Sequence, residues 1–333
     1  MKTHTLSTGL ACGLMLGLLA ACGGGSGDGG DAPSGGPTDA QRAQAASATA
    51  RSAGNACAAV APFYWEVGNR SMLLASGSVD TPGGVHYTAA TPMAIASASK
   101  WLFGAYVAER RGGALTADDV RFLNFRSGYT SFQFCLQGQT VDQCLAFPAG
   151  NGAYTAATDG YFLYDGGHMQ KLASLLGLGA MDNAALAAEM RAQLGTGIEL
   201  SYTQPQLAGG VASTAQDYAR FLRRLLDGSL KLGPLLGTHA VCTNPLTCTQ
   251  AQGTPVPPSE SWSYSLGHWV ETDPLVGDNA LSSAGAFGFY PWIDATRTLY
   301  GVLARHVVTS GAGAQSASCG RLIRKAWVTA TAQ

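Results

Sequence analysis

The segments typical of β-strands lie at the two ends of this chain, and the segments typical of helices lie between them. Near the start, residues 61–67 and 71–79 have strand-type patterns separated by Gly68-Asn69-Arg70, which predicts a hairpin. Aromatic and β-branched residues return after Pro257, at residues 262–270, 288–293 and 298–307. We therefore expect one antiparallel sheet built from both ends of the chain.

Helical periodicity fills the middle of the sequence. Residues 99–111 place apolar side chains at helical spacing and end at Gly112-Gly113. Further helices are predicted at residues 166–176, 183–194, 214–226 and 321–329. Between about 118 and 160 the pattern weakens into loops rich in Gly, Ser and Thr. The expected class is α/β (α+β): an antiparallel sheet flanked by helices, with a helical subdomain at about 115–215.

The N-terminus has the pattern of an export signal. Lys2 precedes a largely apolar run at 10–21, which is short for a membrane-spanning helix and ends in Leu19-Ala20-Ala21-Cys22. This ending resembles the lipobox of bacterial lipoproteins, in which the cysteine becomes the lipidated N-terminus. We predict a signal peptide at 1–21 and a lipid on Cys22 that anchors the protein on the periplasmic side of the cell envelope. The alternative is an ordinary signal peptide with a chance cysteine.

The residues after the signal are expected to form a tether. From Gly23 to about Ser52 the sequence has almost no large apolar residue, so residues 22–54 are predicted to be flexible and the folded domain to span 55–333. The formal net charge is −1, and no basic run exceeds two residues, which excludes nucleic acid as an expected partner. We expect a monomer.

The cysteines indicate a disulfide framework. Of eight, Cys12 leaves with the signal peptide and Cys22 carries the lipid. In an oxidising envelope the six that remain favour disulfides, although they permit about 15 pairings. A zinc site is the rival interpretation, but there is no Cys-x-x-Cys and the histidines are scattered, so no metal is expected. Short separations favour the pairs Cys135–Cys144 and Cys242–Cys248, which leaves Cys57 with Cys319.

One short segment, Ser97-Ala98-Ser99-Lys100, carries candidate chemistry. A serine and a lysine three residues apart lie one helical turn apart, so the amine of Lys100 can lie beside the Ser97 hydroxyl. Burial and the positive end of the helix would lower the pKa of the amine toward that of a useful base. Serine at a helix start is also an ordinary cap, so the pattern alone is ambiguous.

Neighbouring segments resolve that ambiguity through a resemblance. The segment 95–100 resembles the nucleophile segment of class C β-lactamases, penicillin-binding proteins and family VIII carboxylesterases. Tyr164-Asp165-Gly166 is similar to the tyrosine motif of those proteins, and residues 207–222 are similar to their Gly-Gly-x-x-Ser-Thr-x-x-Asp helix entry. Ser283-Ala284-Gly285-Ala286 resembles their third motif, usually Lys-Thr-Gly or His-x-Gly. The resemblance covers about residues 61–308 and implies a β-lactamase/transpeptidase-like fold.

The resemblance also implies roles for individual residues. Ser97 would be the nucleophile and Lys100 its base, while Tyr164 would pass a proton to the leaving group. The backbone N–H groups of Ser97 and Ala286 would bind the oxyanion. Gly285 would leave room for the substrate. For Tyr164 the alternatives are a packed core aromatic or a misalignment with Tyr161.

The third motif departs from the resembled pattern at Ser283. Many relatives place a cation there that attracts a substrate carboxylate, and a neutral hydroxyl cannot replace it. We therefore expect Ser283 to contact an uncharged small-molecule ester or amide, which leaves β-lactamase or D-Ala carboxypeptidase activity as the alternative. Arg126 is a candidate to supply the missing charge from elsewhere.

Other candidates are weaker. No Gly-x-Ser-x-Gly segment accompanies the histidines, which disfavours a Ser-His-Asp triad. His168 follows Tyr164 by one helical turn and is expected to shape the mouth of the pocket. The glycine pairs and triplets before residue 37 follow no strand, so no cofactor is expected. The different class of function that remains is a non-catalytic binding lipoprotein on the same fold.

Overall fold

The computed structural model describes residues 35–333. The predicted signal peptide, the lipidated Cys22 and the tether as far as residue 34 lie outside the described residues. Residues Pro37–Gln333 form one compact unit. Within the described residues, no helix combines the length and the apolar composition needed to cross a bilayer.

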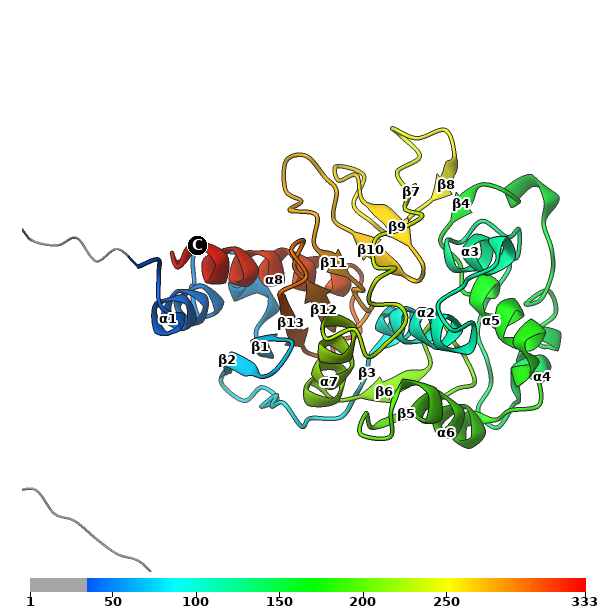
Figure 1. Cartoon of the computed structure of the whole chain (residues 1–333), viewed down its shortest axis with the longest axis horizontal. Helices are drawn as coiled ribbons and strands as arrows, with labels where there is room; N and C mark the ends of the chain where they lie inside the picture. The colour runs from blue at the N-terminus through cyan, green and yellow to red at the C-terminus, as the bar shows by residue number, and fades with distance from the viewer. Residues whose placement is uncertain (1–34) are drawn as a thin grey trace, which may run out of the picture. The chain divides into compact units, whose positions relative to one another are not determined.

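An eight-stranded sheet organises the described chain in the order β2-β1-β13-β12-β11-β10-β9-β7 (Figure 1). Every neighbouring pair is antiparallel, and the first and last long strands are direct neighbours, with Tyr64 of β1 paired with Ala304 of β13. The prediction of one antiparallel sheet from both ends is confirmed. Its strands are β1 (Phe63–Asn69), β2 (Leu73–Val79), β7 (Val241–Cys242), β9 (Ser263–Ser265), β10 (His268–Val270), β11 (Leu281–Ser282), β12 (Tyr290–Ile293) and β13 (Leu299–Ala304).

Helices cover both faces of the sheet at its centre. Tyr300 of β13 accepts a hydrogen bond from Arg223 of α7 (Ala215–Leu226) on one face. On the other face, Tyr290 of β12 accepts one from Arg324 of α8 (Ala312–Thr329). Because both faces are covered, β13 is buried along nearly its whole length. The closing helix α8 is longer than predicted and begins at Ala312 instead of residue 321.

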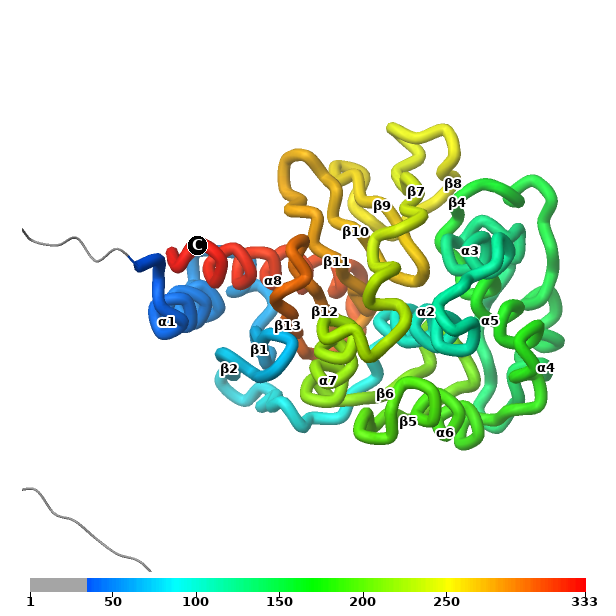
Figure 2. Tube along the Cα trace, viewed as in Figure 1, coloured from blue at the N-terminus to red at the C-terminus, as the bar shows by residue number. Residues whose placement is uncertain are grey.

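Residues 22–54 were predicted to be a tether, and the helix α1 (Asp39–Ala50) corrects that prediction for residues 39–50. Thr38 caps this helix through a capping box with Gln41. The prediction failed because the Ala- and Gln-rich residues lack large apolar side chains, although both residue types favour helices. Small alanines allow α1 to pack closely on α8, and Arg42 donates hydrogen bonds of 2.8 and 2.7 Å to the carbonyls of Trp327 and Val328. The trace in Figure 2 shows the two helices side by side near the chain end.

The helical lobe consists of the helices between the two strand-rich ends of the chain. Its two ends agree with the prediction more closely than its middle does. The predicted helices appear as α2 (Ser99–Arg110), α5 (Gly167–Ala173) and α6 (Asn183–Leu194), with α5 continuing into a wide turn at Ser174–Leu178. The predicted loops also contain short helices, α3 (Ala117–Leu123) and α4 (Val141–Ala146), each started by a threonine capping box. Two small sheets complete the lobe: β3 (Met93–Ala94), β6 (Val211–Ser213) and β5 (Leu200–Tyr202) in one, and β4 (Phe162–Leu163) with β8 (Ala251–Gly253) in the other.

The predicted strand at 262–270 is in fact two strands. β9 and β10 form a tight hairpin whose turn residues, Leu266 and Gly267, have φ values of 45° and 92°. A side chain at Gly267 would also lie 2.6 Å from the Lys100 carbonyl, so glycine is required by conformation and by space. This turn contacts α2, the helix that carries Lys100.

Three disulfides join Cys57 to Cys319, Cys135 to Cys144 and Cys242 to Cys248. The predicted pairing is confirmed. The first bridge spans 262 residues and ties the segment before β1 to α8. The other two close short local loops.

Candidate active site

Ser97 lies in a single 3-10 turn, Ala96–Ala98, immediately before α2. Ile95, the residue before this turn, extends the small sheet of β3, β6 and β5, because its N–H donates to the Val211 carbonyl at 3.0 Å. The chain then turns sharply through Ala96, whose φ is +46°, an unfavourable value for a residue with a side chain. This turn presents Ser97 to solvent at the start of a helix that is otherwise almost completely buried.

Lys100 supplies the amine that the spacing predicted. Its Nζ lies 3.0 Å from Ser97 Oγ and donates a 2.6 Å hydrogen bond to the Ala208 carbonyl. Burial lowers the pKa of Lys100 to about 7, while the nearby Asp165 carboxylate acts in the opposite direction. A large part of the lysine population is therefore neutral near pH 7 and has a lone pair available for the Ser97 proton.

Tyr164 is the third predicted residue of the candidate site, beside Ser97 and Lys100. Its ring stacks on Trp269 with centroids 5.3 Å apart, meets Phe125 edge-on at 5.2 Å, and lies 4.8 Å from Lys100 Nζ. Burial raises the pKa of Tyr164, although a hydrogen bond with Ser97 acts in the opposite direction. The phenol therefore stays protonated and can act as a proton donor. Tyr161, the alternative candidate, is 43% exposed and does not line the cavity beside Ser97.

The backbone of Tyr164 is held from two sides. Its N–H donates to the Gly253 carbonyl of β8 at 3.0 Å. The preceding carbonyl, that of Leu163, lies 3.0 Å from Nε2 of His168, and Nδ1 of the same ring lies 2.6 Å from Ser127 Oγ. Burial lowers the pKa of His168 to about 4, so the ring is neutral. His168 is completely buried, does not line the cavity beside Ser97, and so does not shape the pocket mouth as expected.

The third predicted motif lies beside Ser97, but one of its residues, Ser283, differs from its expected role. Ser283 is buried and donates a 3.1 Å hydrogen bond to the Ser97 carbonyl, so it supports the backbone of Ser97 and does not line the cavity. A side chain at Gly285 would lie 2.2 Å from the Ile95 carbonyl. Glycine is therefore needed for close backbone packing, and Gly285 also lines the cavity beside Ser97.

Ala286 is the residue of this motif that faces the cavity. It is exposed, and its N–H donates to no carbonyl among the backbone hydrogen bonds of the described residues; the same holds for the N–H of Ser97. Both residues line the same cavity. They have the free donors that an oxyanion-binding site requires.

The cavity beside Ser97 has a volume of about 500 Å³. One wall is apolar and aromatic, with Trp262, Trp269 and the segment Pro255-Val256-Pro257. Small residues at 284–286 and near the start of α8 also line the cavity, together with Arg321.

Arg321 is the cation that sequence reasoning missed. Its guanidinium lies 3.0 Å from a Glu260 oxygen and 5.4 Å from the ring of Trp262, so its charge is largely compensated. Arg126, the candidate named from the sequence, donates instead to the Gly160 carbonyl at 2.6 Å and lines a different cavity. No signal in the sequence distinguished Arg321 from other arginines of the closing helix, and none indicated the Ala208 carbonyl.

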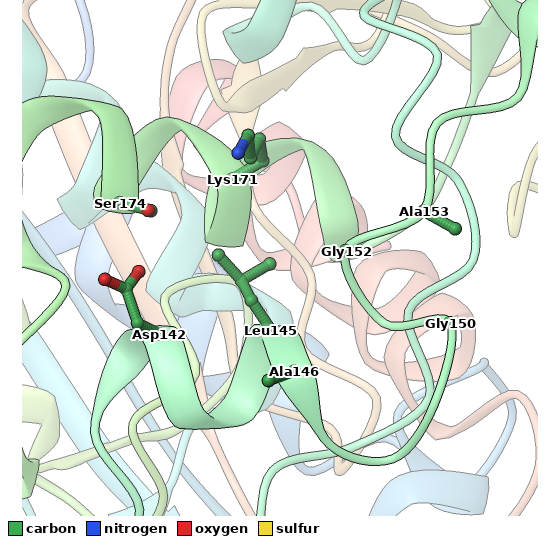
Figure 3. Close-up of a pocket in the computed structure, with 8 residues that line it drawn as sticks. All are labelled: Asp142, Leu145, Ala146, Gly150, Gly152, Ala153, Lys171 and Ser174. Atoms are coloured by element: carbon green, nitrogen blue, oxygen red, sulfur yellow. The ribbon is translucent and has the colours of Figure 1, made fainter.

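A second cavity of about 450 Å³ lies between α4, α5 and the turn at 150–153 (Figure 3). Its lining includes Lys171 and Ser174, which are also three residues apart. No hydrogen bond joins these two side chains, and Lys171 Nζ lies 5.6 Å from the Tyr129 ring. Within the described residues there is also no cluster of His, Cys, Asp and Glu able to hold a metal ion.

Comparison with known proteins identifies the fold. No protein-family model and no curated protein matches the chain. Among solved structures, the hydrolase EstCE1, which has promiscuous acyltransferase activity, is 12% identical with a TM-score of 0.60, over 86% of this chain and 98% of its own. The octameric penicillin-binding protein homologue of Pyrococcus abyssi is 13% identical with a TM-score of 0.59, over 81% and 74%.

A third solved structure extends the comparison to amide hydrolysis. The D-amino acid amidase of Ochrobactrum anthropi SV3 is 12% identical with a TM-score of 0.57, over 79% of this chain and 95% of its own. The chain therefore has the β-lactamase/transpeptidase-like fold, as the sequence resemblance implied. At these identities the likeness shows the fold alone.

Proposed function

We propose that this protein is a serine hydrolase that cleaves an ester or amide through an acyl-enzyme on Ser97. The contact that carries the proposal is the 3.0 Å distance between Lys100 Nζ and Ser97 Oγ. The amine is buried, has a lowered pKa, and acts on a hydroxyl that opens into a cavity. A lysine that only stabilised a helix would have no need of this burial, which is unfavourable for a charged amine.

The reaction begins with transfer of the Ser97 proton to neutral Lys100. Oγ attacks the substrate carbonyl, and the N–H groups of Ser97 and Ala286 bind the oxygen that becomes negative. When the tetrahedral intermediate collapses, Tyr164 gives its proton to the leaving alcohol or amine and recovers one from the Lys100 ammonium. Water then attacks the Ser97 ester by the same steps and releases the acid.

The cavity favours an uncharged acyl group. Trp262, Trp269 and the two prolines offer apolar contacts, and Glu260 compensates the charge of Arg321. A carboxylate-bearing β-lactam would have to compete with Glu260 for that guanidinium. We therefore expect kcat/KM for a short neutral ester to exceed that for a cephalosporin by at least about 10².

Glu260→Gln tests this explanation, because it leaves Arg321 without its carboxylate partner. The variant should gain activity toward a carboxylate-bearing substrate and change little toward the neutral ester. Faster hydrolysis of a chromogenic cephalosporin than of neutral esters by the unmodified protein would favour the alternative, β-lactamase or D-Ala carboxypeptidase activity.

A fluorophosphonate probe tests the proposed chemistry directly. We expect the probe to label Ser97, as located by peptide mapping, and a panel of short acyl esters to be turned over. Absence of both labelling and turnover would favour a non-catalytic binding lipoprotein on this fold.

We also propose that the protein acts at the cell envelope. The Leu-Ala-Ala-Cys ending supports lipid attachment at Cys22, and three disulfides suit an oxidising compartment. Cys22→Ser should move the protein from the membrane fraction to a soluble or unprocessed form. Unchanged fractionation of that variant would count against the anchor.

A further inference from the structure

Arg305 is a buried cation directly after β13 that the proposed reaction does not use. It is 4% exposed, and its donors all meet uncharged acceptors. Nε donates to Ser316 Oγ at 2.9 Å, Nη1 to the Val60 carbonyl at 3.2 Å, and Nη2 to the Ala312 carbonyl and Gln315 Oε1, both at 3.2 Å. No ion pair joins Arg305 to a carboxylate of residues 35–333.

Arg324 shows the arrangement that a buried arginine usually has. It is 1% exposed and lies 2.9 Å from a Glu271 oxygen and 2.7 Å from an Asp278 oxygen. Burying a charged group without a counterion costs free energy. The contacts of Arg305 therefore need a different explanation, and their location provides one.

Arg305 contacts two neighbouring parts of the candidate site. On one side, a Cβ at Gly288 would lie 2.8 Å from Cγ and Nε of Arg305, so the arginine stem rests directly on that backbone. The N–H of Gly288 donates to the Gly285 carbonyl at 2.9 Å and closes the turn that contains Ala286. On the other side, the guanidinium binds the first turn of α8 through Ala312.

The first turn of α8 in turn packs on the same segment. A Cβ at Gly313 would lie 2.7 Å from the Gly285 carbonyl, so the two backbones are in direct contact. The turn at 285–288 is thus held between the Arg305 side chain and the helix that Arg305 fixes. Its position decides where the N–H of Ala286 points.

We propose that Arg305 is a positioning residue that fixes the oxyanion-binding N–H of Ala286. The inference rests on the proposed chemistry of Ser97. This positioning role requires the planar set of donors of an arginine, because the Arg305 guanidinium donates to four acceptors. A lysine ammonium cannot reach the same four acceptors with the same geometry.

A comparison of an aryl ester with its thionoester reports on the oxyanion site. Sulfur fits a site built for oxygen poorly, so an ordered site gives a high ratio of kcat/KM for the ester to that for the thionoester. Arg305→Met and Arg305→Lys should both lower kcat for the ester by about 10-fold to 10²-fold with little change in KM, and should reduce this ratio. A merely structural role would lower the melting temperature and the labelled fraction without changing the ratio per labelled site.

Ser316→Ala is the milder variant if the arginine replacements do not fold, since it removes only the acceptor of Arg305 Nε. Its matched control is Ser318→Ala, two residues along the same helix, where the hydroxyl donates to the Ala314 carbonyl and does not touch Arg305. We expect the ester-to-thionoester ratio to fall in Ser316→Ala and to stay at the unmodified value in Ser318→Ala. A ratio unchanged in Ser316→Ala, or restored in Arg305→Lys, overturns the proposal. Failure of the unmodified protein to label at Ser97 would instead refute the proposed function, and this inference with it.

Discussion

Two cavities of this protein each have a serine in the lining with a lysine three residues away, yet only one of these two pairs is joined by a hydrogen bond. At the start of α2, Lys100 is 5% exposed and hydrogen-bonded to Ser97. At the end of α5, Lys171 is partly exposed, and no hydrogen bond joins it to Ser174 (Figure 3). One helical turn brings a lysine and a serine within reach of each other, but it does not make the lysine a base.

The environment makes the difference. Lys100 is surrounded by α2, the Tyr164 ring and the Ala208 carbonyl, so its charged form has lost water without gaining a hydrogen-bonded carboxylate. Lys171 keeps solvent on one side and an aromatic face on the other. The four predictions below test whether reactivity follows this difference.

The largest effect is expected from the two serines. Ser97→Ala should reduce ester turnover and fluorophosphonate labelling to the limit of detection, because the nucleophile is lost. Ser174→Ala should leave both unchanged. The measurement is kcat/KM on a short acyl ester for purified variants with matching circular dichroism spectra; retained activity in Ser97→Ala would end the assignment.

The two lysines should differ by a smaller factor. Lys100→Ala is expected to lower kcat by at least about 10² through loss of the general base, while Lys171→Ala keeps the activity of the unmodified protein. An equal loss in both variants would mean that burial of Lys100 is not what matters. Melting temperatures of both variants provide the control for folding.

The pH profile sharpens the same comparison. Because Lys100 acts as a base only when neutral and has a pKa of about 7, kcat/KM should fall below pH 7 by about tenfold for each pH unit and level off above it. Asp165 raises the pKa of Lys100, so Asp165→Asn should move the midpoint to lower pH. A profile flat between pH 5 and 8 would contradict the role of Lys100.

The sequence predicted those parts of the fold and of the candidate site that depend on local residue patterns. Strand patterns at both ends indicated the sheet, and the three-residue spacing indicated that Lys100 on α2 lies beside Ser97 in the turn before it. The Ala-rich α1 was missed because the small side chains that allow it to pack on α8 carry little hydrophobic signal. The contact of this helix with the distant α8 cannot be seen in the local segment.

The features of the candidate site that the sequence did not predict depend on contacts between distant segments. The Ala208 carbonyl reaches Lys100 across 108 residues, and Ser283 reaches the Ser97 carbonyl across 186. Similarity of a segment to a known motif places a residue near the site, but it does not say which way the side chain points. Ser283 was misassigned for that reason, and Arg321 was overlooked because its approach to the cavity depends on α8.

The smallest effect on activity is expected beside the second cavity, where the Cys135–Cys144 disulfide holds α4. The bridge closes a loop with a sequence separation of 9, for which the chain-entropy model gives a loss of unfolding free energy of about 2–3 kcal/mol when both cysteines become serine. Turnover at Ser97 should stay within about twofold, since local loosening at a separate region need not reach the catalytic residues. Denaturant unfolding and kcat/KM on the same preparation measure the two effects. A large loss of turnover in a variant that is still fully folded would show that the two cavities are coupled. The two serine–lysine pairs could then not be treated as independent sites.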